Sequence, residues 1–162
     1  MTQSIPRIGE YWPEQAGIRV AVIPGQNGQP DYDLILPTHP DAELGELEYG
    51  SYGTKIEGAD SEWDGLTNTQ ALVAAGNHPA AERCAALTIE GHNDFYLPAD
   101  REAAVCYAIA REHFKKRWHW TSTQYGARRA FVQDFGGGGQ DYDGKGCSFG
   151  VRPVRRVSHS SI

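Results

Sequence analysis

The chain has 162 residues, enough for one domain that buries its own core without disulfides. Its 19 glycines and 9 prolines, with 40% hydrophobic and 22% charged residues, favour a loop-rich globular fold. Residues 1–10 lack a basic start followed by an apolar run, and no stretch is apolar enough for membrane insertion. We therefore expect no signal peptide, synthesis in a cytoplasm and no membrane partner.

The formal charge of −6 is distributed unevenly along the chain. Residues 1–114 carry 6 basic and 18 acidic side chains (−12), whereas residues 115–162 carry 9 basic and 3 acidic ones (+6). We expect these two parts to attract each other within one fold. Because the basic residues do not follow one helix and the whole chain is acidic, nucleic-acid binding is not expected.

The first sixty residues predict strands and loops. Residues 5–16 are interpreted as an irregular lead-in whose aromatic residues, Tyr11 and Trp12, pack onto the domain. Residues 17–23 and 31–36 are β-rich runs, and Asn27-Gly28 between them suits a tight turn, so they predict a hairpin. Residues 37–65 predict a long loop with fragments of strand.

The acidic cluster at residues 60–64 has oxygen ligands suited to Ca²⁺ but lacks the spacing of a calcium loop, which favours a solvated loop. Helices are predicted at about 68–75 and 79–87, separated by Gly76-Asn77-His78-Pro79, and from Asp100 to about Phe114. The third helix has one apolar face, formed by Ala103, Cys106, Tyr107, Ala110 and Phe114.

The C-terminal third predicts strands. Alternation from Trp118 places Trp118, Trp120 and Ser122 on one buried face. A second strand runs over residues 129–135, a glycine turn over 136–139, and a closing strand over 149–156 with Pro153 at an edge or bulge.

Motifs that would support catalysis are missing. The serines lack a nucleophile-elbow pattern, and the four-glycine run lacks the Lys-Ser/Thr of a phosphate loop. The three cysteines are interpreted as buried reduced thiols, and the acid pairs Asp31/Asp33 and Asp141/Asp143 as solvated turn residues. We therefore expect no enzymatic activity, no cofactor and no bound metal.

Several segments together resemble a known family. These are Asp94-Phe-Tyr-Leu-Pro98 before a helix, Trp120-Thr-Ser-Thr-Gln124, a polar glycine loop with Lys145, and Val151-Arg-Pro-Val-Arg155. Over residues 63–156 the chain resembles a phage- and prophage-associated family with the C-type-lectin fold, in the variant shared with formylglycine-generating enzymes. Some members of that family are the variable proteins of diversity-generating retroelements.

The resemblance implies an α+β, C-type-lectin-like fold of short twisted antiparallel strands with two or three helices and long loops. It implies a single domain, 1–162, composed of a hairpin and irregular lead-in (1–62), the lectin-like core (63–156) and a tail (157–162). Framework positions would be Trp120, Ser122, Val151, Arg152 and Arg155. The exposed binding face would hold Tyr125, Arg128, Arg129, Phe131, Gln133, Gln140, Tyr142 and Asp143.

The function implied is that of a non-enzymatic phage protein located in the virion. It would be a receptor-binding or adhesin tip or a particle decoration, homo-oligomeric, with other virion proteins and a host-surface receptor, protein or glycan, as partners. One alternative is an intracellular prophage-encoded protein that binds a host protein. Another is a formylglycine-generating oxidoreductase, but the paired cysteines of that active site are missing. The calcium motif of sugar-binding lectins is missing as well, so calcium-dependent sugar binding is not implied.

Overall fold

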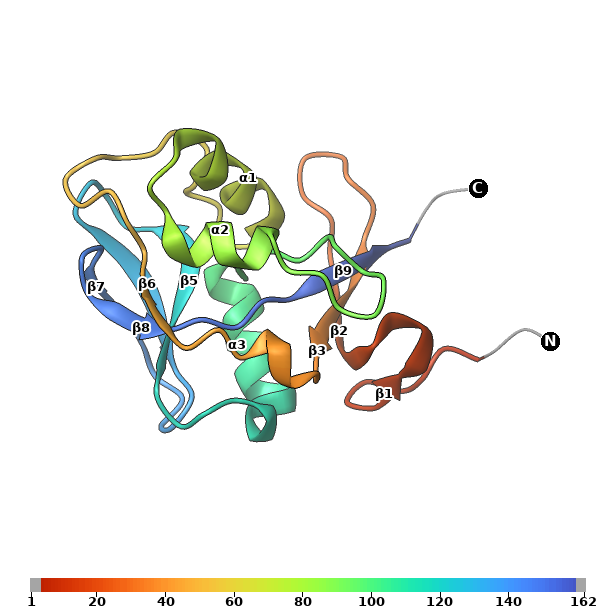
Figure 1. Cartoon of the computed structure of the whole chain (residues 1–162). Helices are drawn as coiled ribbons and strands as arrows, with labels where there is room; N and C mark the ends of the chain where they lie inside the picture. The colour runs from red at the N-terminus through yellow and green to blue at the C-terminus, as the bar shows by residue number, and fades with distance from the viewer. Residues whose placement is uncertain (1–3, 160–162) are drawn as a thin grey trace.

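The computed structural model describes residues 4–159 and shows an α+β fold built on two sheets (Figure 1). The strand order is β1-β2-β3-β9 in one sheet and β4-β8-β5-β6-β7 in the other. All neighbours are antiparallel except β5 and β8. The strands are β1 (Tyr11–Trp12), β2 (Gly17–Ile23), β3 (Tyr32–Pro37), β4 (Glu46–Glu48), β5 (Trp118–Gln124), β6 (Arg129–Asp134), β7 (Gln140–Gly144), β8 (Ser148–Gly150) and β9 (Arg155–Ser158).

The predicted hairpin is confirmed. β2 and β3 pair over Gly17–Ile23 and Tyr32–Pro37, and both turn residues, Asn27 and Gly28, have positive φ, 55° and 79°. Trp12 is buried as expected, whereas Tyr11 on the short edge strand β1 is exposed.

The predicted closing strand, residues 149–156, is wrong as one element. It divides into β8, which pairs with β4, and β9, which pairs with β3 in the other sheet. Pro153 lies in the extended connection between them, where its missing N–H costs no ladder bond. Of the predicted tail 157–162, residues 157 and 158 belong to β9, and 160–162 lie outside the described residues.

Three helices occur where the sequence predicts them: α1 (Gly65–Ala75), α2 (Pro79–Ala85) and α3 (Asp100–Ala110), the last followed by a 3₁₀ turn at Arg111–His113. Asp64 begins α1, because its carboxylate accepts the N–H of Thr67 at 3.0 Å. Asp64 is therefore a helix cap and not only a solvated loop residue. At the start of α3 the cap comes from another element, since Thr123 Oγ1 accepts the N–H of Asp100 at 2.9 Å.

The core has two large parts and a small third one around Phe95, and α3 lies between the sheets and contacts both (Figure 1). One large part joins β2 and β3 to α3 through residues such as Val20, Leu34 and Cys106. The other large part joins the five-stranded sheet to α1 and α2 through Trp120 and Leu72. The hairpin β2–β3, which the resemblance places before the core, is thus itself part of the core.

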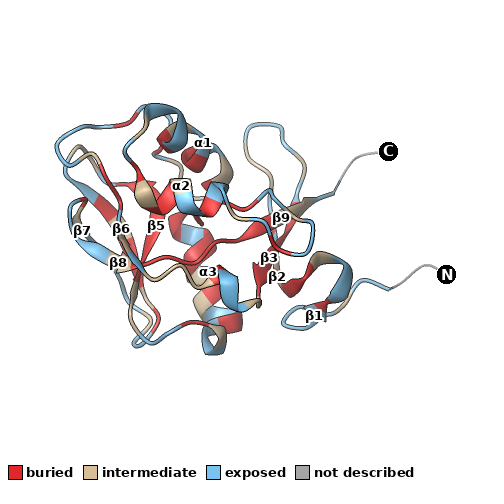
Figure 2. Ribbon diagram, viewed as in Figure 1, coloured by how far each residue is buried: buried red, intermediate tan, exposed pale blue. Residues whose placement is uncertain are grey.

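The predicted one-sided burial of β5 is wrong, because every residue from His119 to Gln124 is buried (Figure 2). Trp120 packs in the core beneath α1 and α2, whereas Thr121 and Thr123 on the other face hydrogen-bond to backbone groups of Phe131 and Ser61. Buried hydroxyls are tolerated there because each has a partner.

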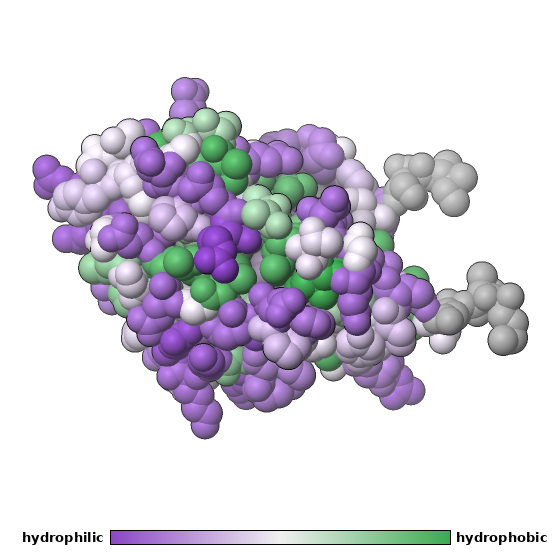
Figure 3. Space-filling model, in the orientation of Figure 1, coloured by the Kyte–Doolittle hydropathy of each residue, from purple (hydrophilic) through white to green (hydrophobic). Residues whose placement is uncertain are grey.

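The unequal charge along the sequence produces ion pairs inside the fold, as expected. Arg117 and Arg152 pair with Glu43, Arg155 pairs with Asp94, and Arg156 pairs with Asp64. Each pair joins the C-terminal part to residues 1–114. The face of the molecule in Figure 3 is largely hydrophilic, and apolar residues show there between polar ones. Within residues 4–159, no helix combines the length and the apolar character that crossing a membrane requires.

Candidate binding surface

The register of β6 and β7 decides which predicted site residues lie together. Phe131 is paired with Tyr142, and Arg129 with Gly144. Because side chains alternate along a strand, Arg129, Phe131 and Tyr142 point to the same face of the sheet. β7 is an edge strand of the five-stranded sheet and lies at one side of the molecule, so these three side chains lie there too (Figure 1).

Three aromatic rings form an ordered cluster there. The rings of Tyr125 and Tyr142 stack in parallel, 4.2 Å apart and 6° from coplanar, and Phe131 stands edge-on to both. The guanidinium of Arg129 lies 5.4 Å from the Tyr142 ring. Tyr125 and Tyr142 remain 57% and 38% exposed. We call Tyr125, Arg129, Phe131 and Tyr142 the tyrosine surface.

The turn between β5 and β6 borders this surface. Its ends are closed by the Tyr125 N–H, which donates to Arg129 O at 2.8 Å. An open hollow of about 480 Å³ is lined by residues 125–129. Arg128 and Arg129 are exposed, and neither forms an ion pair with any residue from 4 to 159. Unlike the arginines of β9, they are free to meet a partner.

Tyr52 belongs beside this surface and was missed by the sequence analysis. Its ring lies next to Gly144 at the end of β7, and its side chain is among the most exposed hydrophobic ones, at 62%. The loop that carries it is attached to the β5–β6 turn, because the Gly53 N–H donates to Ala127 O at 2.9 Å. The only local signal is an aromatic residue between two glycines, Gly50-Ser-Tyr-Gly53.

Of the other residues predicted for the face, Gln140 lies on it, whereas Gln133 is buried and Asp143 points away. Gln133 is 1% exposed, and its amide donates to the backbone carbonyls of the glycine turn. Gln140 is exposed, but its amide donates to Asp100 O at 3.0 Å and so ties β7 to α3. Asp143 alternates with Tyr142 and lies on the opposite face of β7.

The framework positions are all buried, with polar groups that bond to distant backbone or side chains. Trp120 Nε1 donates to Leu47 O, Ser122 Oγ accepts from Asn68, Arg152 donates to Pro37 O, and Arg155 Nε donates to Asp94. Val151 is wholly buried in the core beneath α2. Trp120 and Ser122 thus fix β5 of the five-stranded sheet, and Arg152 and Arg155 fix the chain where it enters the four-stranded sheet.

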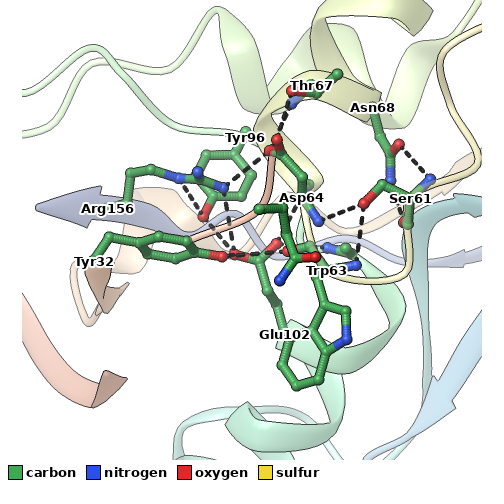
Figure 4. Close-up of polar contacts among 12 residues, drawn as sticks. Tyr32, Ser61, Trp63, Asp64, Thr67, Asn68, Tyr96, Glu102 and Arg156 are labelled. Atoms are coloured by element: carbon green, nitrogen blue, oxygen red, sulfur yellow. Dashed lines mark hydrogen bonds and ion pairs between the residues drawn. The ribbon is translucent and has the colours of Figure 1, made fainter. Parts of the chain in front are cut away.

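A buried ionic cluster joins the four-stranded sheet to the starts of α1 and α3 (Figure 4). Glu102 accepts hydrogen bonds from the hydroxyls of Tyr32 and Tyr96 at 2.7 and 2.6 Å. The guanidinium of Arg156 lies 3.9 Å from the Tyr32 ring and 4.8 Å from the Tyr96 ring, and pairs with Asp64. Burial raises the pKa of Glu102 and of both tyrosines. Because Glu102 is wholly buried, the cluster serves the fold rather than a substrate.

The cysteines agree only in part with the expectation of buried thiols. Cys84 and Cys106 are buried, which raises the pKa of both thiols, but Cys147 is exposed. All three are free. Across residues 4–159 the fold brings together no group of three His, Cys, Asp or Glu side chains that could hold a metal ion.

Comparisons with known proteins assign no family to the chain. No protein-family model matches it, and no curated protein matches it. The function proposed for the chain therefore rests on the geometry of the tyrosine surface and on the resemblance over residues 63–156.

Proposed function

We propose that this chain is a non-enzymatic binding protein that presents the tyrosine surface to a receptor on a bacterial host. The observation that carries the proposal is the parallel stack of Tyr125 on Tyr142. Both rings are about half exposed to solvent, and Arg129 lies over the Tyr142 ring. Aromatic residues and arginine are the types on which binding energy concentrates in protein interfaces.

The tyrosine surface is prearranged for binding. Tyrosine exposes a large area with only two side-chain torsions, and stacking restricts these torsions before a partner arrives. Because the rings of Tyr125, Phe131 and Tyr142 already contact each other, little further ordering is needed on binding. The exposed Arg128 and Arg129 add hydrogen-bond donors to the same surface and its border.

The position of the surface suits display. The described chain enters and leaves on one side of the molecule, at the end of the four-stranded sheet, and β7 lies on the opposite side (Figure 1). A protein attached to a particle through either end would keep the tyrosine surface pointing outward. Several copies on one particle would gain affinity by multivalent attachment, which favours a homo-oligomer with virion proteins as its other partners.

The phage setting and the finer fold type come from the resemblance over residues 63–156. We infer a C-type-lectin-like fold, with which the α+β arrangement of antiparallel curled sheets is compatible. The chain would then be a receptor-binding or adhesin tip, or a decoration, of a phage particle.

Competition during adsorption tests this function. Host cells are incubated with purified protein before phage is added, and adsorption is counted while mass spectrometry searches the purified virions for the chain. A receptor-binding protein should be present in virions and slow adsorption in a dose-dependent way. Presence without competition would identify a decoration, and absence from virions would contradict the proposal and favour the intracellular alternative.

A further inference from the structure

A second hollow lies on the other face of β7, away from the tyrosine surface. It has a volume of about 250 Å³ and is lined by Trp118, Val132, Asp141, Asp143 and Phe149. These residues come from β5, β6, β7 and β8, so the hollow spans four neighbouring strands of the sheet.

The strand register explains why acids and aromatics meet there. Asp141 is paired with Val132, and Asp143 with Ala130, so both carboxylates point away from the Tyr142 face. The half-buried rings of Trp118 and Phe149 pack on the edge of the core beneath α1 and α2 and form the apolar side of the hollow. The hollow thus has aromatic rings on one side and two carboxylates on the other.

Each carboxylate uses one oxygen for local structure. Asp141 Oδ1 accepts the N–H of the next residue, Tyr142, at 2.8 Å. Asp143 Oδ1 accepts the Gly144 N–H at 2.7 Å and the Cys147 thiol at 3.7 Å. The second oxygen of each has no hydrogen-bond donor among residues 4–159, and neither aspartate forms an ion pair within that range.

We propose that this hollow binds an arginine side chain of a protein partner. A guanidinium stacks on aromatic rings and donates paired hydrogen bonds to carboxylates, and the hollow offers both within a volume suited to one side chain. A hard metal ion fits less well, because Val132 and the two rings supply none of the six or more oxygen ligands that Ca²⁺ requires.

The two faces of β7 would then recognise different chemistry. The tyrosine surface, with Arg129 in it and Arg128 at its border, is basic, whereas the hollow has two aspartates; none of the four forms an ion pair within residues 4–159. The arginine site uses none of the residues of the tyrosine surface, so it does not depend on the receptor-binding proposal. Either one can fail while the other stands.

A titration with a minimal probe tests the site. N-acetyl-arginine amide is added to the full chain, and the Trp118 indole and Val132 methyl signals are followed by NMR. N-acetyl-citrulline amide, which has nearly the same shape without the charge, serves as the matched neutral probe. We expect saturable shifts at both signals with the arginine probe and none with citrulline.

The double variant Asp141→Asn with Asp143→Asn should weaken binding of the arginine probe about tenfold, because charge-assisted hydrogen bonds become neutral ones. Both side chains are exposed and isosteric with their replacements, so the fold should be kept, as circular dichroism can check. Glu57→Gln, which removes an exposed acid elsewhere, should leave the affinity unchanged. Equal responses to both probes, or unchanged affinity in the double variant, would overturn the proposal.

Discussion

Glu102 is the residue on which the most distant parts of the chain converge. It accepts the hydroxyls of Tyr32 and Tyr96 and the backbone N–H groups of Gly65 and Ala99, both at 3.0 Å. Four donors therefore fill its two oxygens. A carboxylate can accept all of them, whereas an amide would direct its own hydrogens toward two of the donors.

The variant Glu102→Gln should lower the free energy of unfolding by about 3 kcal/mol, since a buried and paired charge is removed and donors are left without acceptors. Urea denaturation measures this loss. Glu112→Gln, at an exposed glutamate just beyond α3, is the matched control and should change little. A loss in Glu102→Gln no larger than in the control would contradict the role assigned to this cluster.

His119 contributes to the pH dependence of stability, beside His78, whose pKa burial also lowers. Its ring packs edge-on against Phe114 and Phe135, and Nδ1 hydrogen-bonds to Arg117 O at 3.0 Å. Burial lowers the pKa of His119 from 6.5 to about 4. The folded chain therefore holds the neutral ring. The contribution of His119 to the stability of the fold is complete above pH 6.5 and is lost as the pH falls toward 4.

Between those two pH values the wild type should lose about 3 kcal/mol of stability through this group, and the variant His119→Gln should lack that part of the loss. Unfolding free energies measured at several pH values give the difference between the two curves. His113→Gln, at a partly exposed histidine, should follow the wild-type curve. Parallel curves for wild type and His119→Gln would show that the ring does not titrate as described.

Side-chain contacts at this scale could be predicted only where they are local. The sequence places Glu102 three residues after Ala99, which suits the observed bond from the Ala99 N–H. Nothing local relates Glu102 to Tyr32, 70 residues away, because that contact exists only after β3 and α3 have packed. The sequence does not reveal that Gln133 is buried, for the same reason: its burial depends on the glycine turn folding back over it.

At the scale of elements, Lys145 holds the loop that borders the tyrosine surface. Although it is wholly buried, its Nζ donates to Thr54 O at 2.9 Å and to Gln124 Oε1 at 3.1 Å. Gln124 Oε1 also accepts the N–H of Ile56. Burial lowers the pKa of Lys145 to about 8. The ammonium thus links the β7–β8 turn, the end of β5 and the loop carrying Tyr52.

The variant Lys145→Met should free this loop, because Thr54 O and Gln124 Oε1 lose a donor at a local cost of about 2 kcal/mol. Hydrogen exchange at the Ile56 and Gly53 amides should accelerate by about thirtyfold, with α3 unchanged. Lys115→Met, at an exposed lysine before β5, is the control. Unaltered exchange in the loop would mean that backbone contacts alone hold it.

Elements whose signals are local were predicted well. The Asn27-Gly28 turn and the glycine and proline between α1 and α2 act on the backbone directly, so the hairpin and the helices occur where expected. The strand at β5 is confirmed, but its one-sided burial and the single closing strand are wrong, because both depend on contacts with distant segments. Strand periodicity does not reveal that helices and loops cover both faces of β5, or that the chain changes sheets at Pro153.

At the scale of the whole molecule, charge separates into a structural and an exposed set. Arg117, Arg152, Arg155 and Arg156 join the C-terminal part to the acidic remainder, as the uneven charge along the sequence led us to expect. Arg128 and Arg129, beside the exposed tyrosines, form no ion pair with the described residues 4–159. The sequence could not separate these two sets, because both are simply basic residues of the last third.

The most direct test of the receptor-binding account is the binding of labelled protein to host cells, compared between wild type and Arg128→Ala with Arg129→Ala. Arg83→Ala, at an exposed arginine on α2, is the matched control. The double variant should bind at least about tenfold more weakly, while its melting temperature and the control's binding stay unchanged. Wild-type binding by the double variant, or a lowered melting temperature, would contradict it.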